Sequence, residues 1–322
     1  MTLPYLVRLL SLSLACFFLV HTVLAMAVWA VSRRAIQRAE RLRPKDGATL
    51  LLALRLLPAA AALAAVALLC VPSFLWLEPS ETAEEAGLAC LAAALLVGAV
   101  WLAAVARAAQ GLVQSCRYRR TWKSVGQPAF VMEGWAVWVV DAAAPVLALA
   151  GVVRPRILLS RGLMEALDPD QLRVALLHEQ AHCRSRDNIK RLALLLAPQI
   201  LPGWRAFHAL ERAWARITEW AADESAAGGD EQRRLALAEA LVRAVRLGCA
   251  GIPAGPLAAA LLEGPGDLDA RVQRLLEAPP ERKSGRRYWR AAVGLAAAAL
   301  AVLLLQPGTL YSVHWLLEGL MR

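Results

Sequence analysis

The sequence contains no CxxC pair, and its six cysteines are scattered along the chain. A disulfide framework or a cysteine-based zinc site needs clustered, regularly spaced cysteines, so the sequence favours neither. Histidine is scarce as well, with five residues in 322, and no internal repeat is evident. What the chain does have in quantity is apolar sequence.

The hydrophobic share of the chain is 58% and its mean hydropathy is +0.47, which is too apolar for an ordinary soluble protein of this length. Four segments are each long enough for the roughly 20 residues with which a helix crosses a bilayer. They are residues 4–31, 49–77, 86–114 and 291–313. We therefore predict a polytopic α-helical membrane protein with four spans. The first segment exceeds the roughly 7–15-residue core of a cleaved signal peptide, so we expect it to be retained.

Charged residues near the spans predict the orientation. The loop after the first span is basic, with Arg33, Arg34, Arg38, Arg41, Arg43 and Lys45. The loop between the second and third spans is acidic, with Glu78, Glu81, Glu84 and Glu85. Basic loops stay in the cytoplasm, so we expect the N-terminus outside a bacterial-type inner membrane. Arg8, Arg55 and Arg107 lie near span ends, where their side chains are expected to reach the lipid headgroups.

Residues 115–288 have basic residues at both ends and are expected in the cytoplasm. The chain thus divides into three spans over 1–114, a cytoplasmic domain over 115–288, and a fourth span with a short tail over 289–322. The net charge of +10 is explained by basic clusters beside the spans, which meet anionic lipid. The lipid bilayer is therefore an expected partner, and nucleic acid is not.

Within the cytoplasmic domain, short β-prone runs between residues 129 and 160 predict a small sheet or hairpin. Helices are expected at about 169–191, 204–227 and 231–247, followed by a loop over 251–266 and a polar linker over 278–287. The first helix has a clear start, with Asp168 as N-cap, Pro169 at the first position and Gln171 completing a capping box.

The helix predicted at 169–191 carries His178-Glu179-Gln180-Ala181-His182. Histidines four residues apart lie on one helix face, so both imidazoles can bind one metal ion. Glu179 beside them is the candidate general base for a water molecule. The motif is short and occurs by chance, but this one lies on a well-capped helix and uses two of only five histidines. The pattern favours a zinc (Zn²⁺) site.

Glu219 is the best candidate for the third ligand that a catalytic zinc requires. It starts Glu219-Trp220-Ala221-Ala222-Asp223, which places two carboxylates one helical turn apart, and Asp223 is expected to orient a ligand histidine. Glu211 and His208 on the same predicted helix are competing third ligands. Cys183, next to His182, is expected to be a packed core thiol.

The sequence resembles the M56 peptidase family of membrane metalloproteases, typified by β-lactam sensor-transducers, and more distantly the M48 membrane proteases. The similarity is carried, in the family's order, by residues 154–160, 178–182, 186–188, 219–223 and 270–276. It implies a mainly α-helical, gluzincin-like domain in which His178, His182 and Glu219 bind zinc, Glu179 is the base and Asp223 supports a ligand. Only about ten residues follow the fourth span, so an extracellular penicillin-binding sensor domain is not expected.

The leading hypothesis is a zinc endopeptidase that cleaves a cytoplasmic protein in regulated proteolysis. A transcriptional repressor, as in the resembling sensors, and the protein's own linker at 278–287 are the candidate substrates. The alternative is a non-catalytic membrane signalling or scaffold protein with a structural zinc site. Arg186 and Asp187 either brace the histidine helix or form an ordinary surface ion pair. The small residues from Ala59 to Ala65 permit close helix packing in a homodimer or within one chain.

Overall fold

The computed structural model describes residues 5–77, 87–125, 127–132, 134–142, 145–153, 155–200, 204–248, 257, 259–260 and 268–277, and residues 306, 308, 311, 312 and 315. Three of its helices are long and apolar enough to cross a membrane. The first is α1 (Tyr5–Arg41); the second runs from α2 (Pro44–Ala65) through a π-helical turn (Val66–Cys70) into α3 (Val71–Leu77); the third is α4 (Leu88–Val125). Three of the predicted spans are therefore present as helices of sufficient length and hydropathy, and the fourth, 291–313, lies outside the described residues.

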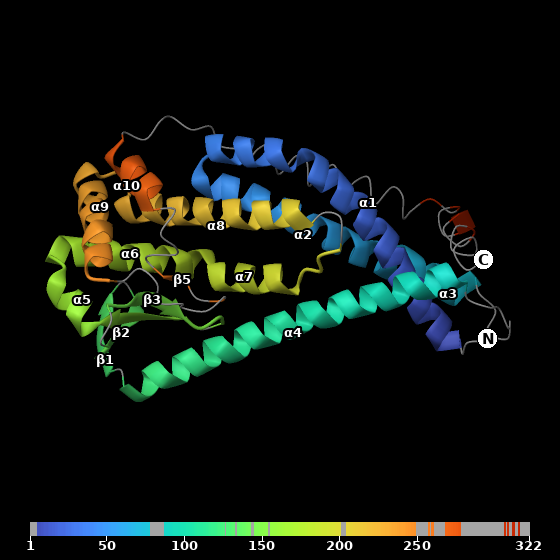
Figure 1. Cartoon of the computed structure of the whole chain (residues 1–322), viewed down its shortest axis with the longest axis horizontal. Coiled ribbons are helices and arrows are strands. Elements are labelled where there is room, and N and C mark those ends of the chain that lie inside the picture. Colours follow the sequence, from blue (N-terminus) through green and yellow to red (C-terminus); the bar gives the residue numbers. More distant parts are fainter. Residues whose placement is uncertain are drawn as a thin grey trace.

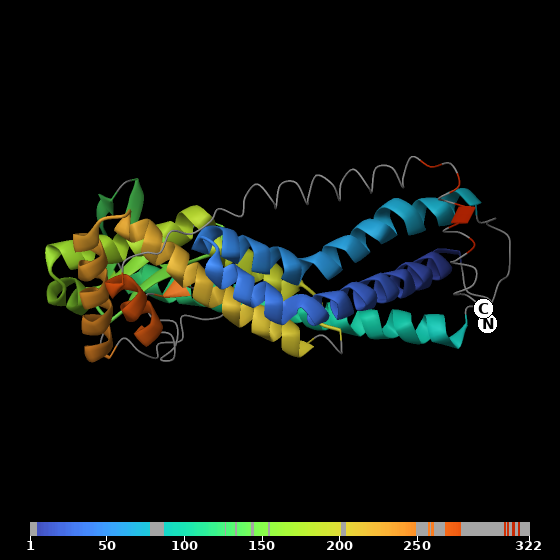
Figure 2. The ribbon, with the colours of Figure 1, turned by 90° about the horizontal axis from the view of Figure 1, so that it is seen from above.

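Two of these helices are much longer than a bilayer is thick. Helix α1 has 37 residues and α4 has 38, about 55 Å each at 1.5 Å per residue, against about 30 Å of hydrocarbon. Both run past the ends of the predicted apolar segments, at residues 31 and 114. In Figures 1 and 2, α3 and the outer parts of α1 and α4 form one end of an elongated molecule, while the sheet and α5, α6, α9 and α10 form the other.

Two of the three arginines expected to reach the headgroups are instead buried between helices. Arg8 is 3% exposed and Arg55 1%, whereas Arg107 is exposed. Arg55 Nε donates to Glu211 Oε1 at 2.6 Å, and its guanidinium lies 4.6 Å from the centre of the Phe207 ring. A buried charge needs such a partner. The sequence could not reveal it, because Glu211 is 156 residues away.

The remaining elements, from β1 to α10, all lie within the segment 115–288. Its five-stranded sheet has the order β1-β2-β4-β3-β5, with bounds β1 Gln127–Met132, β2 Trp135–Val140, β3 Leu147–Ala150, β4 Arg156–Ser160 and β5 Ala259–Ala260. Strands β2 and β4 are parallel, and the other pairs are antiparallel. The predicted small sheet is thus present, but β5 comes from within the stretch expected to be a loop.

Helices cover this sheet and build the core. They are α5 (Arg161–Ala166), α6 (Pro169–Ser185), α7 (Asp187–Leu196), α8 (Trp204–Ala227), α9 (Glu231–Arg246) and α10 (Leu268–Leu276). Helix α6 packs on β3 and β4 and against α8 and α9. One apolar cluster joins the inner sides of the strands, α6, α9 and α10, with Leu149, Leu159, Leu176 and Leu241 almost fully buried. The predicted helices at 204–227 and 231–247 are confirmed within one residue.

Helix α6 begins as the sequence predicts but ends six residues early. Gln171 Oε1 accepts a hydrogen bond from the Asp168 backbone N–H at 3.3 Å, which forms the expected capping box. The helix stops at Ser185 because Arg186 takes the left-handed conformation, with φ 55° and ψ 42°. This conformation is uncommon for a residue with a Cβ atom, so no glycine marked the break. The chain turns there and starts α7 at Asp187.

Helix α8 is held between the α1–α2 pair and α6 (Figure 1). Its residues Phe207, Leu210, Trp214 and Ile217 are buried in one cluster with residues of α1 and α2, and Arg216 pairs with Glu40 near the end of α1. On the other side of the domain, α4 packs against α7. Contacts with α1, α2 and α4 therefore fix the positions of the helices that build the site.

Candidate metal centre

Helices α6 and α8 bring together the three donors expected to bind zinc. His178 Nε2 lies 3.2 Å from His182 Nε2 and 3.4 Å from Glu219 Oε2, and His182 Nε2 lies 3.5 Å from Glu219 Oε1. In a tetrahedral zinc site with bonds of about 2.0–2.1 Å, neighbouring donor atoms are about 3.3–3.4 Å apart. The separations in this chain therefore match those of a zinc site.

The polar atoms of this group need a cation. The rings of His178 and His182 are 0% exposed and point their Nε2 atoms at each other. Glu219 Oε1 accepts no hydrogen bond from the described residues, and Glu219 Oε2 makes an ion pair with Arg271 Nη1 at 3.1 Å. Buried polar atoms without partners are costly. A metal ion between the three side chains would satisfy all of them, so the residues present fit zinc.

Two aspartates hold the outer nitrogens of the histidines. Asp187 Oδ2 lies 2.8 Å from His182 Nδ1 and forms a hydrogen bond with it. Asp223 Oδ1 lies 2.9 Å from His178 Nδ1, although this contact is not well aligned as a hydrogen bond. Such carboxylates set the ring orientation and raise the basicity of a ligand histidine. Asp223 was expected in this place. The role of Asp187 was left open between bracing the histidine helix and forming a surface ion pair. Because Asp187 is only 1% exposed and bonds to His182, it braces the helix.

Arg271 of α10 is a part of the site to which the sequence assigned no role. Its guanidinium donates to Asp223 from Nη2 at 2.7 Å and from Nε at 3.0 Å, and Nη1 lies 3.1 Å from Glu219 Oε2. The residue is 3% exposed. Its charge offsets the two acids and ties α10 to α8. In the sequence, Arg271 lies four residues before the apolar Leu275, so both side chains fall on one face of α10. This spacing was the available signal, because the structure shows that Leu275 is buried.

Glu179 is buried beside the donors without a partner. It is 0% exposed, and neither carboxylate oxygen accepts a hydrogen bond from the described residues. Burial disfavours the charged form, and although the neighbouring histidines oppose this effect, the pKa of Glu179 rises to about 7. Without metal, this carboxyl group therefore exchanges its proton near neutral pH.

The charges of the ligand side chains are tightly linked. Burial disfavours the charged form of His182, but Glu219 and Asp187 outweigh this effect and raise its pKa to about 10. Burial likewise favours the protonated form of Glu219, yet His182 and Arg271 hold its pKa well below the usual range. Without metal, the carboxylates therefore favour protonated histidine. Binding of zinc must release that proton, because a metal ligand histidine is neutral.

The structure separates the competing third ligands from this group. Glu211 pairs with Arg55 and also accepts a hydrogen bond from Gln199 Nε2 at 3.2 Å, and His208 Nδ1 lies 3.5 Å from Glu211 Oε2. Among the described residues, the one group of histidine, cysteine and acidic side chains arranged to hold a metal is His178, His182 and Glu219. Cys183 is 4% exposed within the apolar core, as expected of a packed thiol.

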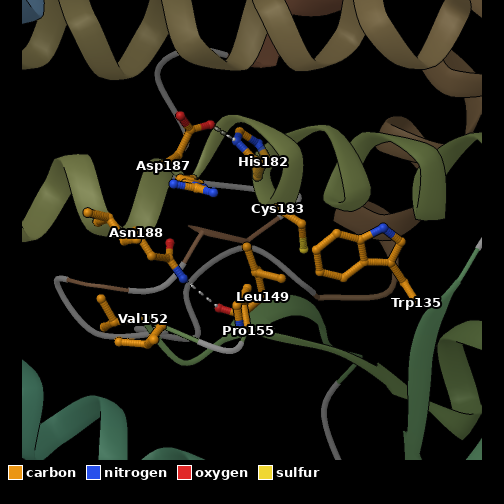
Figure 3. A pocket seen from close by; sticks show the side chains of 11 residues that line it. Trp135, Leu149, Val152, Pro155, His182, Cys183, Asp187 and Asn188 are labelled. Atoms are coloured by element: carbon orange, nitrogen blue, oxygen red, sulfur yellow. Dashed lines mark hydrogen bonds and ion pairs between the residues drawn. The ribbon is translucent and has the colours of Figure 1, made fainter.

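A pocket of about 340 Å³ lies where α6 meets α7, against the end of β3. Figure 3 shows Leu149, Asn188, Asp187 and His182 around it, with Trp135 and Cys183 facing each other at one side. Asn188 Nδ2 donates to Gly151 O at 2.7 Å and thereby ties the start of α7 to the chain after β3. The pocket thus adjoins the residues that hold His182.

The fold and the site define the class of protein, a helical membrane protein with a metallopeptidase-like domain. A family model described as peptidase family M48 matches residues 115–209, less than a third of the chain. The matched stretch includes the sheet strands β1–β4, α6 and both histidines, and it ends before Glu219. It supports a metallopeptidase family. A comparison with curated proteins gives no match.

Proposed function

We propose that this protein is a membrane-embedded, zinc-dependent endopeptidase of the gluzincin type that acts in regulated proteolysis. The observation that carries the proposal is the set of three donor atoms at zinc spacing, with the unpartnered carboxyl group of Glu179 beside them. In this reading His178, His182 and Glu219 hold the metal. Asp187 and Asp223 orient the two histidines.

Bound zinc supplies a Lewis acid that polarises a peptide carbonyl and acidifies water. Glu179 takes the proton from that water at its carboxylate and passes it to the leaving amine. The carboxyl group of Glu179 is buried and has no hydrogen-bond partner among the described residues, so it is free to hold the proton between the two transfers. The buried setting of Glu179 and its neighbours excludes bulk water from competing with these transfers.

The alternative is a scaffold protein with a structural zinc. Structural zinc sites generally have four protein ligands, whereas catalytic sites have three and an open position; the described residues offer three. A structural site also gains nothing from burying a carboxyl group without a partner, which costs free energy of folding. Both features favour catalysis.

The M56 assignment and the topology are parts of the same proposal. Glu219, Asp223 and Arg271 lie beyond the M48 match and belong to the motifs that resemble M56, and three apolar helices accompany the domain. The basic residues after the first span favour a cytoplasmic domain in a bacterial-type inner membrane. The substrate proposed is therefore a cytoplasmic protein, for example a transcriptional repressor, or the protein's own segment 278–287.

The test combines metal analysis with a cleavage assay. Full-length protein is purified in detergent as wild type, His178→Ala and Glu179→Gln, and each form is also co-expressed with candidate repressors. We expect about one zinc per chain in wild type and Glu179→Gln and a loss of zinc in His178→Ala. Cleavage should fall by about 10²–10⁴-fold in Glu179→Gln. Stoichiometric zinc without cleavage in any assay would instead support the scaffold function.

A further inference from the structure

The pocket where α6 meets α7 has mostly apolar walls. They are formed by Trp135, Leu149, Val152, Pro155 and Ile189. On another side the pocket is lined by His182 and Asp187, which are almost fully buried and bonded to each other at the metal centre. A volume of about 340 Å³ is at the small end for ligand sites in proteins. The pocket therefore fits one side chain or a group of similar size.

A buried acceptor in this lining has no partner among the described residues. Asn188 is 2% exposed, and its Nδ2 lies 2.7 Å from Gly151 O and 3.5 Å from Leu149 O (Figure 3). Because both neighbours are carbonyl oxygens, the amide nitrogen must face them and Oδ1 is the free end. Oδ1 accepts no hydrogen bond from the described part of the chain. A buried acceptor of this kind favours a ligand that supplies an N–H donor.

The carboxylate in the lining is already engaged. Asp187 Oδ2 bonds to His182 Nδ1, and its Oδ1 accepts a hydrogen bond from Lys190 Nζ at 2.7 Å. A basic ligand would have to compete with one of these contacts, whereas an apolar group leaves both intact and is buried by the walls. Arg186 is exposed, so its charge stays in water. The lining thus favours an uncharged apolar group next to an N–H donor, which is what an apolar residue of a peptide presents.

The pocket adjoins the metal centre through His182, which lines it and also points Nε2 at the other donors. A group in the pocket therefore lies about one imidazole ring away from the position where the donor atoms meet. Residues of an extended chain are spaced by about 3.3–3.6 Å. A side chain in the pocket would then belong to a residue about two positions from the bond at the metal.

We propose that this pocket binds an apolar side chain of the protein substrate, close to the cleaved bond, while Asn188 Oδ1 accepts the backbone N–H of the same residue. The inference rests on the proposed peptidase function, because that function supplies the peptide. It adds the class of residue that the enzyme selects. A residue of the size of leucine is accepted, and a charged residue is not.

The test uses full-length, zinc-loaded protein in detergent and four fluorescently labelled dodecapeptides of alanine and serine. They differ at one central residue, which is leucine, alanine, lysine or N-methyl-leucine. N-methylation removes the N–H donor without any change to the protein. Fluorescence polarisation measures binding in a Glu179→Gln background. With Glu179 intact, mass spectrometry of the products locates the cleaved bond.

Two substitutions change the pocket, and one serves as a control. Ile189→Trp, at a 40% exposed position of α7, fills part of the space, and Val152→Ala removes part of a wall. Leu196→Trp is the matched control, because Leu196 lies on the same helix, is 37% exposed and is outside the lining. The alanine peptide controls for effects that do not depend on the pocket.

We expect the leucine peptide to bind about tenfold more tightly than the alanine, lysine and N-methyl-leucine peptides. Ile189→Trp and Val152→Ala should reduce this preference, Leu196→Trp should retain it, and cleavage should fall at a fixed spacing from leucine. Equal binding of the leucine and alanine peptides, or a preference that both pocket variants retain, would overturn the inference. Equal binding of the leucine and N-methyl-leucine peptides would overturn the role of Asn188.

The same measurements separate this inference from the proposed function. Leucine-selective binding that the pocket variants reduce, without cleavage when Glu179 is intact, would leave the pocket assignment standing and remove the peptidase function. Cleavage at positions unrelated to leucine would do the reverse. If Ile189→Trp does not fold, Val152→Ala and the N-methyl-leucine peptide decide.

Discussion

His182 Nδ1 and Asp187 Oδ2 lie 2.8 Å apart across the turn at which α6 ends and α7 begins. Arg186 makes this contact possible, because its left-handed conformation turns the chain back toward the histidine. Asp187 is in turn paired with Lys190 at 2.7 Å. The contact fixes the ring so that Nε2 faces His178 and Glu219.

Asp187→Ala is therefore expected to weaken zinc binding by about 10–100-fold, the usual effect of losing a carboxylate behind a ligand histidine. Asp187→Asn should have a smaller effect, because its amide oxygen can still accept a hydrogen bond. Competition with a chromogenic chelator measures the affinity. Asp170→Asn, at the exposed first turn of α6, is the control and should bind zinc as wild type does. Unchanged affinity in Asp187→Ala would remove the bracing role.

Arg271→Met should be strongly destabilising. The substitution leaves Asp223 and Glu219 buried without the guanidinium that contacts both, and breaking a buried ion pair costs about 3–5 kcal/mol. Thermal and denaturant unfolding of the zinc-loaded protein in detergent measure the loss. Arg246→Met, at an exposed position near the end of α9, should change stability by less than about 0.5 kcal/mol. A comparable small change in both variants would contradict the role of Arg271.

The stability of metal-free protein should depend on pH through Glu179. Its folded pKa of about 7 lies above the ordinary value of 4.5, so its contribution to stability is full below about pH 4.5 and is lost as the pH rises through 7. Glu179→Gln cannot ionise and should be more stable than wild type at pH 8 by up to about 3 kcal/mol. Unfolding of both proteins is measured with chelator from pH 5 to 8.5. The difference in their free energy of unfolding should become smaller toward pH 5. A difference that does not change with pH would contradict the raised pKa of Glu179.

The Arg55–Glu211 pair should behave as a buried ion pair that joins the second span to α8. Glu211→Gln leaves the charge of Arg55, which is 1% exposed, without its partner and should cost several kcal/mol. The double variant Arg55→Met, Glu211→Leu removes both charges and should be closer to wild type in unfolding temperature. Arg212→Ala, at an exposed position of α8, is the control. Additive losses in the double variant would show that the pair is not coupled.

Local sequence patterns were sufficient for much of the architecture. Apolar length predicted three helices of membrane-spanning length, since each needs only its own residues. The capping box at Asp168 and Gln171 and the spacing of His178 and His182 predicted the start of α6 and two donors on one face, because both depend on contacts within one or two helical turns. The helices of residues 204–227 and 231–247 were likewise predicted by their periodicity.

Contacts between distant segments were decided only by the tertiary structure. Arg271 meets Asp223 across 48 residues and Arg55 meets Glu211 across 156, and no local pattern identifies such partners. The left-handed conformation of Arg186 depends on the packing of α6 and α7, since a residue with a Cβ atom does not favour it. Pairing of β5 with β3 depends in the same way on the sheet. The sequence thus predicted the candidate metal donors, while folding determined what orients them and what balances their charge.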